Sequence, residues 1–192
     1  MTGIRSWTAD VTAFVMVVKI ERKGGSTMNA EKAAHASRDQ LNLVLSFFPR
    51  VESKSSVLLA IDTSMLGFLA AKAPRLQEFS TWTGLAAILT VLLLSASIVL
   101  LYRGAFPQLS GGHGSLIYFR EIANRTEHRF VEEFRAQSEE QYVNDVLGQA
   151  WRNSEILRTK FDCLKHAFTF MALAILPWLT TIVLFATRPA SN

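Results

Sequence analysis

Two long runs without a charged residue dominate the hydrophobic pattern of this 192-residue chain. Residues 79–102 form a run of 24 residues, and residues 167–187 form a run of 21 residues. A helix of about 20 apolar residues crosses the ~30 Å hydrocarbon layer of a bilayer, so each run predicts a transmembrane helix. We place these helices at 79–102 and 166–187. Trp82 and Tyr102 flank the first of them, as is typical of side chains at the membrane interface.

A third apolar segment, residues 55–71, contains a single acid near its middle, Asp62. Its 17 residues are at the lower limit for a span, so it either crosses the membrane or lies in the interface. If it crosses, 17 Lys and Arg residues lie on one side of the membrane and three on the other. If it does not cross, residues 1–81, with ten Lys and Arg, lie opposite residues 103–165, with nine. Basic residues collect on the cytoplasmic side. The sequence therefore predicts three spans, a cytoplasmic amino terminus and an external tail, residues 188–192.

Polar residues inside the predicted spans are candidates for function or for helix packing. A carboxylate at the centre of a bilayer costs roughly 2.5–3.5 kcal/mol and usually faces the interior of a helix bundle, which makes Asp62 a functional candidate. Thr90, Ser95 and Ser97 are small and polar, so they allow close packing or hydrogen bonds between helices. Pro177 removes a backbone hydrogen bond and bends the third span. That bend is either a packing feature or a hinge, and both interpretations stay open.

The polar segments have helical periodicity as well. Residues 29–54 carry an apolar seam with steps of four and three residues, which predicts an amphipathic cytoplasmic helix that Pro49 ends or kinks. Helical spacing also extends over residues 116–134 of the cytoplasmic region, residues 103–165. Residues 1–28 are interpreted as a poorly ordered or misannotated extension, because residues 24–27, Gly-Gly-Ser-Thr, break regular structure just before Met28. Their pattern also lacks the features of a cleaved signal peptide.

A capping box at Ser138 and Gln141 predicts the start of the last helix. Its seam, which includes Val143, Leu147 and Ala150, continues into the third span without a glycine or proline between Gly148 and Pro177. We therefore expect one helix from about 139 to 187, roughly 70 Å long. The predicted fold class is an all-α membrane protein with three transmembrane helices and a cytoplasmic helical bundle.

The motifs of common enzymes are missing from this sequence. Its histidines are scattered, and no metal-ligand spacing or activated-nucleophile motif occurs. The single cysteine, Cys163, has no base near it in the sequence, which favours a structural thiol. Residues 115–165 contain nine acids and eight bases, a balance that argues against nucleic-acid binding. We expect neither catalysis, nor a metal, nor a cofactor.

A basic cluster is the candidate ligand-binding site: Arg120, Arg125, His128 and Arg129. Three- and four-residue spacing places the last three on one helical face, where guanidinium groups can bind a nucleotide phosphate. The alternative is a solvated face, in which these cations alternate with glutamates. The loop at residues 111–114 either holds a phosphate through its backbone or acts as a flexible joint; it lacks the Lys-Ser/Thr of a P-loop.

Several short motifs follow one another in a characteristic order. They are Glu52-Ser53-Lys54-Ser55, Leu116-Ile117-Tyr118-Phe119-Arg120-Glu121-Ile122-Ala123, Glu140-Gln141-Tyr142, Asp145-Val146-Leu147-Gly148-Gln149 and Ile156-Leu157-Arg158-Thr159-Lys160-Phe161. This arrangement resembles the Pycsar transmembrane effector family, PycTM, of bacterial anti-phage defence. The resemblance covers about residues 29–187.

The resemblance implies a membrane effector. A partner cyclase would make cyclic CMP or cyclic UMP on infection, and the effector would impair the bacterial inner membrane and cause abortive infection. Three helices per chain cannot line a wide pore, so we expect a homo-oligomer. The alternative is a membrane anchor or scaffold that presents a coiled-coil cytoplasmic arm to a partner protein. A transporter is disfavoured because the sequence contains no internal repeat.

Overall fold

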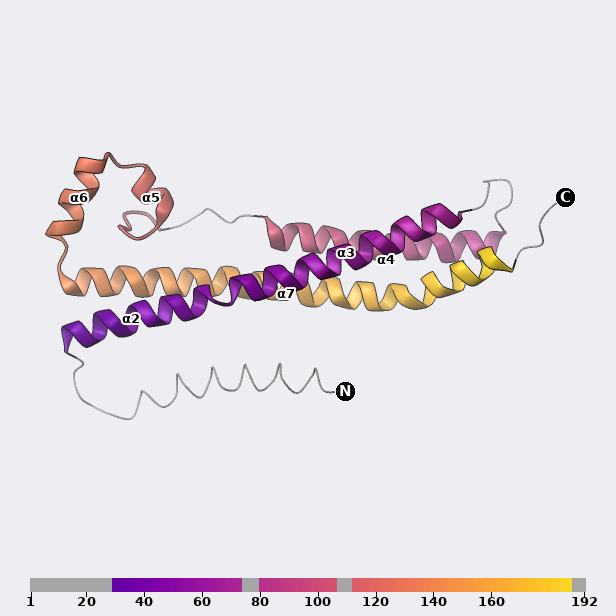
Figure 1. Cartoon of the computed structure of the whole chain (residues 1–192), viewed down its shortest axis with the longest axis horizontal. Helices are drawn as coiled ribbons and strands as arrows, with labels where there is room; N and C mark the ends of the chain where they lie inside the picture. Colours follow the sequence, from indigo (N-terminus) through magenta and orange to yellow (C-terminus); the bar gives the residue numbers. More distant parts are fainter. Residues whose placement is uncertain (1–28, 74–79, 107–111, 188–192) are drawn as a thin grey trace.

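The computed structural model describes residues 29–73, 80–106 and 112–187. Within these ranges the chain is helical and contains no strand, which confirms the all-α fold. The long helices lie side by side as a rod, and two short helices lie at one end of it (Figure 1). The extension predicted at residues 1–28 and the tail at 188–192 lie outside the described residues.

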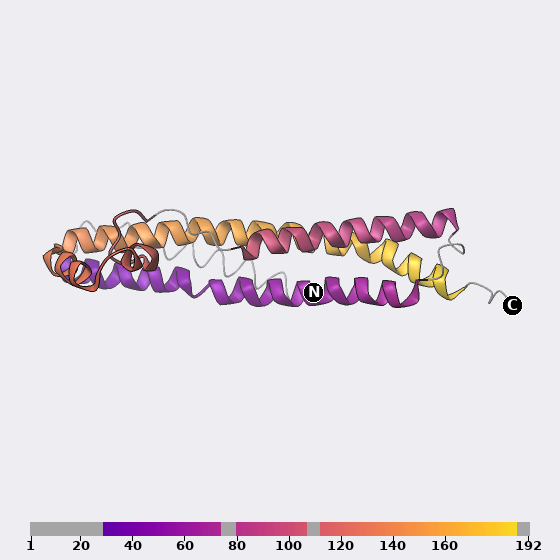
Figure 2. The same ribbon diagram turned by 90° about the horizontal axis from the view of Figure 1, so that it is seen from above.

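Three helices are long and apolar enough to cross a membrane, as the hydropathy pattern predicted. They are the helix α3 (Phe48–Lys72), the helix α4 (Thr81–Ala105) and the carboxyl-terminal part of α7 (Glu139–Ala186). α3 runs toward the end of the rod where the carboxyl terminus lies, α4 returns, and α7 runs out again (Figures 1 and 2). At 1.5 Å per residue the 25 residues of α4 extend about 37 Å, enough to cross the hydrocarbon layer.

The side chains of α4 are arranged as a lipid environment requires. Leu85, Ile88 and Leu92 point outward and are exposed in the isolated chain, whereas Thr90 and Ser97 are buried against the other helices. Small polar residues let membrane helices approach closely, while large apolar side chains face lipid. The expectation for Thr90 and Ser97 is confirmed in this respect. Ser95 is exposed and does not take part in the packing.

The apolar core of the membrane region lies where all three spans meet. Leu58 of α3, Leu101 of α4, and Ala167 and Met171 of α7 form one buried cluster. Close to its cytoplasmic end, the Nζ atom of Lys160 lies 3.6 Å from a carboxylate oxygen of Glu52. α7 packs along α4 and also contacts α3, so it is the helix that joins the spans together.

The first cytoplasmic helix is shorter than predicted. α2 (Ala30–Leu45) ends at a turn formed by Ser46 and Phe47, and α3 starts at Phe48. Pro49 therefore lies in the first turn of the next helix and does not end the preceding one. A proline is tolerated there because the first backbone N–H groups of a helix have no acceptor within it.

α2 packs along the cytoplasmic half of α7. Ser37 and Val44 are buried in this contact, and the Nε atom of Arg38 donates to the hydroxyl oxygen of Tyr142 at 2.7 Å. The seam predicted on α7 is wrong at Leu147, which is exposed, while its neighbours Val146 and Gln149 are buried. Residues 115–116 also contact α7, through hydrogen bonds with Asp145 and Gln149, and this contact turns the buried side toward Gln149.

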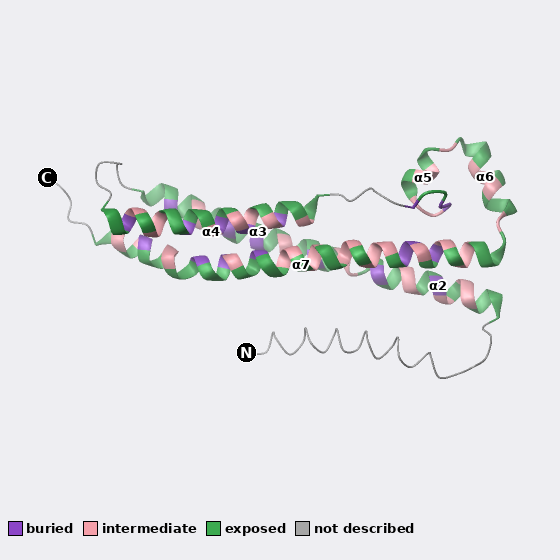
Figure 3. Cartoon of the chain, turned by 180° about the vertical axis from the view of Figure 1, so that it is seen from behind, coloured by how far each residue is buried: buried purple, intermediate pink, exposed green. Residues whose placement is uncertain are grey.

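The helix predicted over residues 116–134 is interrupted. The structure has α5 (Phe119–Ala123) and α6 (Glu127–Ala136), separated by residues 124–126. Thr126 is the reason for the break, because its side-chain oxygen accepts from the backbone N–H of Arg129 and caps α6. Neither helix has a buried residue, and Figure 3 shows the buried positions gathered along the long helices.

α7 runs without interruption from Glu139 to Ala186, as predicted. The predicted capping box is present: Ser138 accepts from the backbone of Gln141 at 3.2 Å, and the Gln141 side chain accepts from the backbone of Ser138 at 2.9 Å. The helix bends near its carboxyl-terminal end, where Pro177 lies (Figures 1 and 2). The hydroxyl of Thr181 donates to the carbonyl of Pro177 at 2.7 Å, one turn beyond the proline.

Candidate functional site

The predicted ligand-binding residues lie at the tip of the rod where α5 and α6 are found (Figure 1). Arg120 is on α5, Arg125 lies in the turn between α5 and α6, and His128 and Arg129 are on α6. Arg125, His128 and Arg129 each lie beside a glutamate side chain. This arrangement matches the alternative of a charge-balanced face, and the role of these residues in ligand binding stays a prediction.

The guanidinium group of Arg125 holds the tip together. Its Nε donates to Glu133 at 2.7 Å, and its Nη1 and Nη2 donate to the backbone carbonyls of Glu121 and Gly114 at 2.6 and 3.1 Å. The side chain is only 12% exposed. A guanidinium group has five N–H donors in a fixed plane, which suits this role of joining several segments. Arg125 therefore links α5, α6 and the glycine loop.

His128 and Arg129 lie on the outer surface of α6. His128 is 3.3 Å from Glu132, and the Nε of Arg129 donates to Glu133 at 2.7 Å. Hydrogen bonds donated by Arg129 and, to a lesser extent, by Arg125 lower the pKa of Glu133 below its usual value. The hydrogen bond between Arg129 and Glu133 also raises the pKa of Arg129. Glu133 is therefore a carboxylate at neutral pH and already has two cations as partners.

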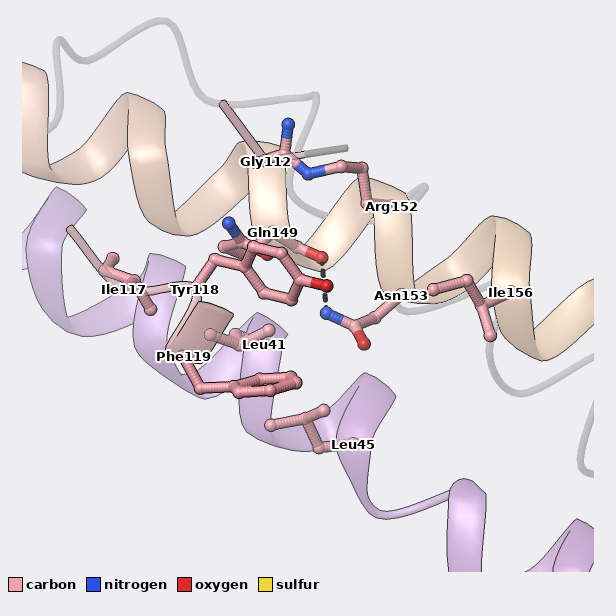
Figure 4. A pocket seen from close by; sticks show the side chains of 10 residues that line it. All are labelled: Leu41, Leu45, Gly112, Ile117, Tyr118, Phe119, Gln149, Arg152, Asn153 and Ile156. Atoms are coloured by element: carbon pink, nitrogen blue, oxygen red, sulfur yellow. Dashed lines mark hydrogen bonds between the residues drawn. The ribbon is translucent and has the colours of Figure 1, made fainter. Parts of the chain in front are cut away.

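A cavity of about 250 Å³ lies beside this cluster, between α2, α7 and residues 112–119 (Figure 4). Leu41 and Leu45 of α2 form one wall. Tyr118 and Phe119 line it from the loop, with their rings 5.0 Å apart and nearly perpendicular. Ile156 of α7 lies at one end. Most of the lining is therefore apolar, and two aromatic rings face a space the size of a small molecule.

Two glycines shape the loop that closes the cavity. Gly112 and Gly114 both have a positive φ, +78° and +77°, which side-chain-bearing residues rarely adopt. A Cβ atom at position 112 would also lie 2.6 Å from Cδ1 of Tyr118, whereas a Cβ at 114 would meet no atom within 4 Å. Gly112 is therefore required both by its backbone and by the adjacent ring. Of the glycines predicted in this loop, Gly111 lies outside the described residues.

Two polar side chains of α7 fix the loop in place. Asp145 accepts from the backbone N–H of Leu116 at 2.8 Å, and Gln149 donates to the hydroxyl oxygen of Ser115 at 2.8 Å. Ser115 in turn accepts from the backbone of Tyr118 at 3.0 Å. The sequence analysis did not assign these roles. Their four-residue spacing, which places Asp145 and Gln149 on one face of α7, was the available signal.

The polar wall of the cavity is formed by Arg152 and Asn153, which follow Gln149 on the same side of α7. Figure 4 shows Arg152 extending toward the glycine loop and Asn153 extending toward α2. The amide of Asn153 donates to the carbonyl of Gln149 at 2.8 Å. The Nε atom of Arg152 is buried and has no hydrogen-bond partner among the described residues. A buried donor without an acceptor costs about 1–3 kcal/mol, and more when it is charged.

The membrane region has a polar cluster of its own. Asp62 is fully buried, and its Oδ2 accepts from the hydroxyl of Ser97 at 2.6 Å. The Oγ of Ser97 is also 3.0 Å from the carbonyl oxygen of Ala167 on α7. The Oδ1 of Asp62 has no partner among the described residues. Asp62 thus faces the helix interfaces, as expected of a carboxylate in a span.

Toward the carboxyl-terminal end of α7, Trp178 connects this helix to α3. Its Nε1 donates to the carbonyl of Met65 at 3.1 Å, and its ring lies 5.9 Å from that of Phe68. Trp178 directly follows Pro177, so the bent part of α7 is held against α3. No group of three or more potential metal ligands occurs in the described part of the chain.

A family model described as PycTM, Pycsar effector protein domain, matches residues 36–187. The chain belongs to the PycTM family. Neither the curated proteins nor the solved structures contain a match to it. This PycTM protein is therefore a membrane effector of anti-phage defence, and its three apolar helices make it a multi-pass membrane protein.

The matched range, residues 36–187, covers the cavity and the three spans as one PycTM domain. It begins in α2, contains both walls of the cavity and all three spans, and ends one residue after α7. The cavity at Arg152 and the polar cluster at Asp62 therefore lie in the same family domain. The intact helix α7 contributes to both.

Proposed function

We propose that this PycTM protein is a nucleotide-gated effector of the bacterial inner membrane. Cyclic CMP or cyclic UMP, made by a partner cyclase on phage infection, would bind the cytoplasmic region and trigger loss of membrane integrity, which gives abortive infection. The proposal is supported by membership of the Pycsar effector family and by a cavity in the cytoplasmic region. The nucleotide acts as a signal and is not consumed, in keeping with a non-catalytic effector.

One observation carries the proposal: α7 links the cavity to the membrane without a break. Gln149 and Ile156 line the cavity, and Ala167 contacts Ser97 inside the span. Only about 17 Å of helix separates Ile156 from Ala167. A ligand changes such a structure only if it binds one arrangement more tightly than another, by a few kcal/mol. A movement of α7 at the cavity would reach the spans directly.

Orientation follows from charge. The tip with α2, α5, α6 and the cavity is placed in the cytoplasm, because residues 1–54 and 103–165 carry most of the Lys and Arg of the chain. A cytoplasmic amino terminus puts the cavity in the compartment where a cyclase would release its product.

Assembly of several copies is part of the proposal. Three spans per chain cannot surround a wide pore, so a lesion needs a homo-oligomer or a disturbance of the lipid. Leu147 and Trp151 lie on one face of the cytoplasmic half of α7 and are exposed to water in the single chain. Large apolar side chains exposed together are typical of a protein interface. A second copy would cover them.

Pro177 is proposed as a hinge within this movement. The bend it causes lies where Trp178 holds α7 against α3. In Pro177→Ala the helix regains a backbone donor and straightens. If the bend serves gating, dye release from liposomes falls while nucleotide binding stays normal. If both stay at the wild-type level, the bend is a packing feature and the hinge is excluded.

The proposed function is tested with the purified chain in liposomes that contain a self-quenching dye. A panel of 3′,5′-cyclic mononucleotides and cyclic dinucleotides is added, and dye release is followed. We expect release with one cyclic pyrimidine mononucleotide. Release with a cyclic dinucleotide alone would move the protein to another signalling system. Folded protein that neither binds nor responds to any of them would favour the scaffold.

A further inference from the structure

We propose that the cavity between α2, α7 and residues 112–119 binds the activating nucleotide, with Arg152 on its phosphate and the rings of Tyr118 and Phe119 beside its base. The inference rests on the proposed function, because it names the site at which that signal acts. It differs from the site predicted by the basic cluster at Arg120, Arg125, His128 and Arg129.

Charge is the first argument. Arg152 is the only charged residue among the described residues that line the cavity. Its Nε–H is buried and lacks an acceptor, and the described chain offers it no ion pair. A charged, buried donor without an acceptor is what a bound anion would satisfy. Since there is one such cation, the ligand should carry about one negative charge, as a cyclic phosphodiester does and a nucleoside triphosphate does not.

Size and lining are the second argument. The volume of about 250 Å³ is slightly below the usual range for drug-sized ligands, which suits one nucleotide better than a dinucleotide. Leu41 and Leu45 offer an apolar surface opposite two aromatic side chains, which together favour a flat ring. Asn153 extends into the same space from α7, and its carboxamide can recognise the polar edge of a base (Figure 4).

The basic cluster is a weaker candidate site because its guanidinium groups already have acceptors, whereas the Nε of Arg152 has none in the described chain. The guanidinium group of Arg125 already donates to Glu133 and to three backbone carbonyls, and Arg129 donates to Glu133 as well. A phosphate would have to displace these acceptors. At Arg152 it would displace none of the acceptors in the described chain.

The location of the cavity explains how binding reaches the membrane. Its walls come from α2, α7 and the loop that Asp145 and Gln149 fix to α7. A ligand that contacts Leu45 and Arg152 together would draw α2 and the loop toward α7. Since α3 follows α2 after a turn of two residues, that change would reach two of the three spans.

The experiment measures equilibrium binding of cyclic CMP, cyclic UMP, cyclic AMP and cyclic GMP to the full chain in lipid nanodiscs. Arg152→Met keeps an unbranched apolar stem and removes the guanidinium group with its charge. The matched control is Arg158→Met on the same helix, whose side chain is 86% exposed. We expect Arg152→Met to lower the affinity for the activating nucleotide at least tenfold and Arg158→Met to change it less than twofold. Because Arg152 has no hydrogen-bond acceptor in the described chain to lose, its variant should melt no earlier than the wild type.

A second measurement on the wild type does not depend on any variant. An azido analogue of the bound nucleotide is photo-crosslinked, and the labelled peptide is identified by mass spectrometry. Label within residues 112–119 or 149–156 supports the cavity. Unchanged affinity in Arg152→Met, or label confined to residues 125–135, would overturn the cavity but leave the nucleotide-gated function standing. A wild-type chain that binds none of the four nucleotides would overturn the function and the site together.

Discussion

Two regions of the molecule, the spans and the tip of the rod, each contain a buried polar atom that has no hydrogen-bond partner in the described chain, but the surroundings differ. At the membrane end, the Oδ1 of Asp62 lacks a donor inside tightly packed helices, and the residue has no exposed surface. At the cytoplasmic end, the Nε of Arg152 lacks an acceptor beside a cavity. The enclosed carboxylate has no room for a ligand, whereas the guanidinium group borders space for one. This difference is consistent with the proposal that the nucleotide binds at the tip, while Asp62 contributes to helix packing in the spans.

The membrane cluster is also easily rearranged. Ser97 has one hydroxyl hydrogen, yet its Oγ lies within hydrogen-bond distance of both Asp62 and the carbonyl of Ala167. It can donate to only one of them at a time. Since Asp62, Ser97 and Ala167 belong to three different helices, a small shift of α7 changes which bond is made. A ligand at the other end of the helix therefore needs only a small movement to alter the contacts among the spans.

The largest effect is expected from a disulfide crosslink that prevents α7 from moving relative to α4. A Cβ atom at position 104 would lie 3.0 Å from the Cβ of Cys163, and a disulfide needs about 3.5–4.5 Å, so a small adjustment allows the bond. Gly104→Cys in oxidised liposomes should abolish nucleotide-induced dye release, and a reductant should restore it. Nucleotide affinity should change little. The control is Gly104→Ser under the same oxidising conditions.

Full dye release from the oxidised Gly104→Cys protein, with the crosslink confirmed by mass spectrometry, would contradict this account. It would mean that α4 and α7 stay fixed relative to each other during activation. The signal would then have to travel through α2 and α3.

The next effect in size concerns the loop at the cavity. Gly112→Ala brings a Cβ atom into the ring of Tyr118 and also strains a positive φ. Gly114→Ala introduces the same kind of strain without a clash. We expect nucleotide affinity to fall at least tenfold in Gly112→Ala and clearly less in Gly114→Ala, as measured by calorimetry. Equal losses would show that backbone strain alone matters and that the position of Tyr118 does not.

At the membrane end, the effect should appear as lost stability and not as lost affinity. Ser97→Ala removes the donor to Asp62 and leaves a buried carboxylate without a partner, which costs about 1–3 kcal/mol. Thermal melting in detergent measures this cost, and Ser95→Ala on the lipid-facing side of α4 is the control. Asp62→Asn keeps an acceptor for Ser97. If it leaves both toxicity and nucleotide response unchanged, a gating role for Asp62 is excluded.

The sequence alone predicted the parts of this molecule that depend on local or one-dimensional patterns. Two of the spans follow from uncharged runs and the third from the distribution of Lys and Arg, and the start of α7 follows from Ser138 and Gln141. The break at Thr126 was missed because the helical spacing of apolar residues continues across it, and a single capping threonine does not alter that spacing. Arg152 was missed for another reason. Its importance depends on which acceptors are absent around it, and only the packing of α2 and residues 112–119 against α7 reveals that.

The smallest effect is expected at the charged tip, where Arg125 and Glu133 hold α5, α6 and the glycine loop together. The pKa of Glu133 is held below its usual value of about 4.5 by hydrogen bonds from Arg129 and Arg125. Its stabilising contribution is therefore complete above about pH 4.5 and is lost as the pH falls through the lower, folded-state pKa.

Hydrogen exchange of α6 should stay constant from pH 7 to 5, after correction for the intrinsic rate, and should increase only in more acidic solution. Glu133→Gln should remove this dependence, while Glu132→Gln, which faces His128, should retain it. A large change at higher pH, or the same dependence in Glu133→Gln, would show that another group controls the tip.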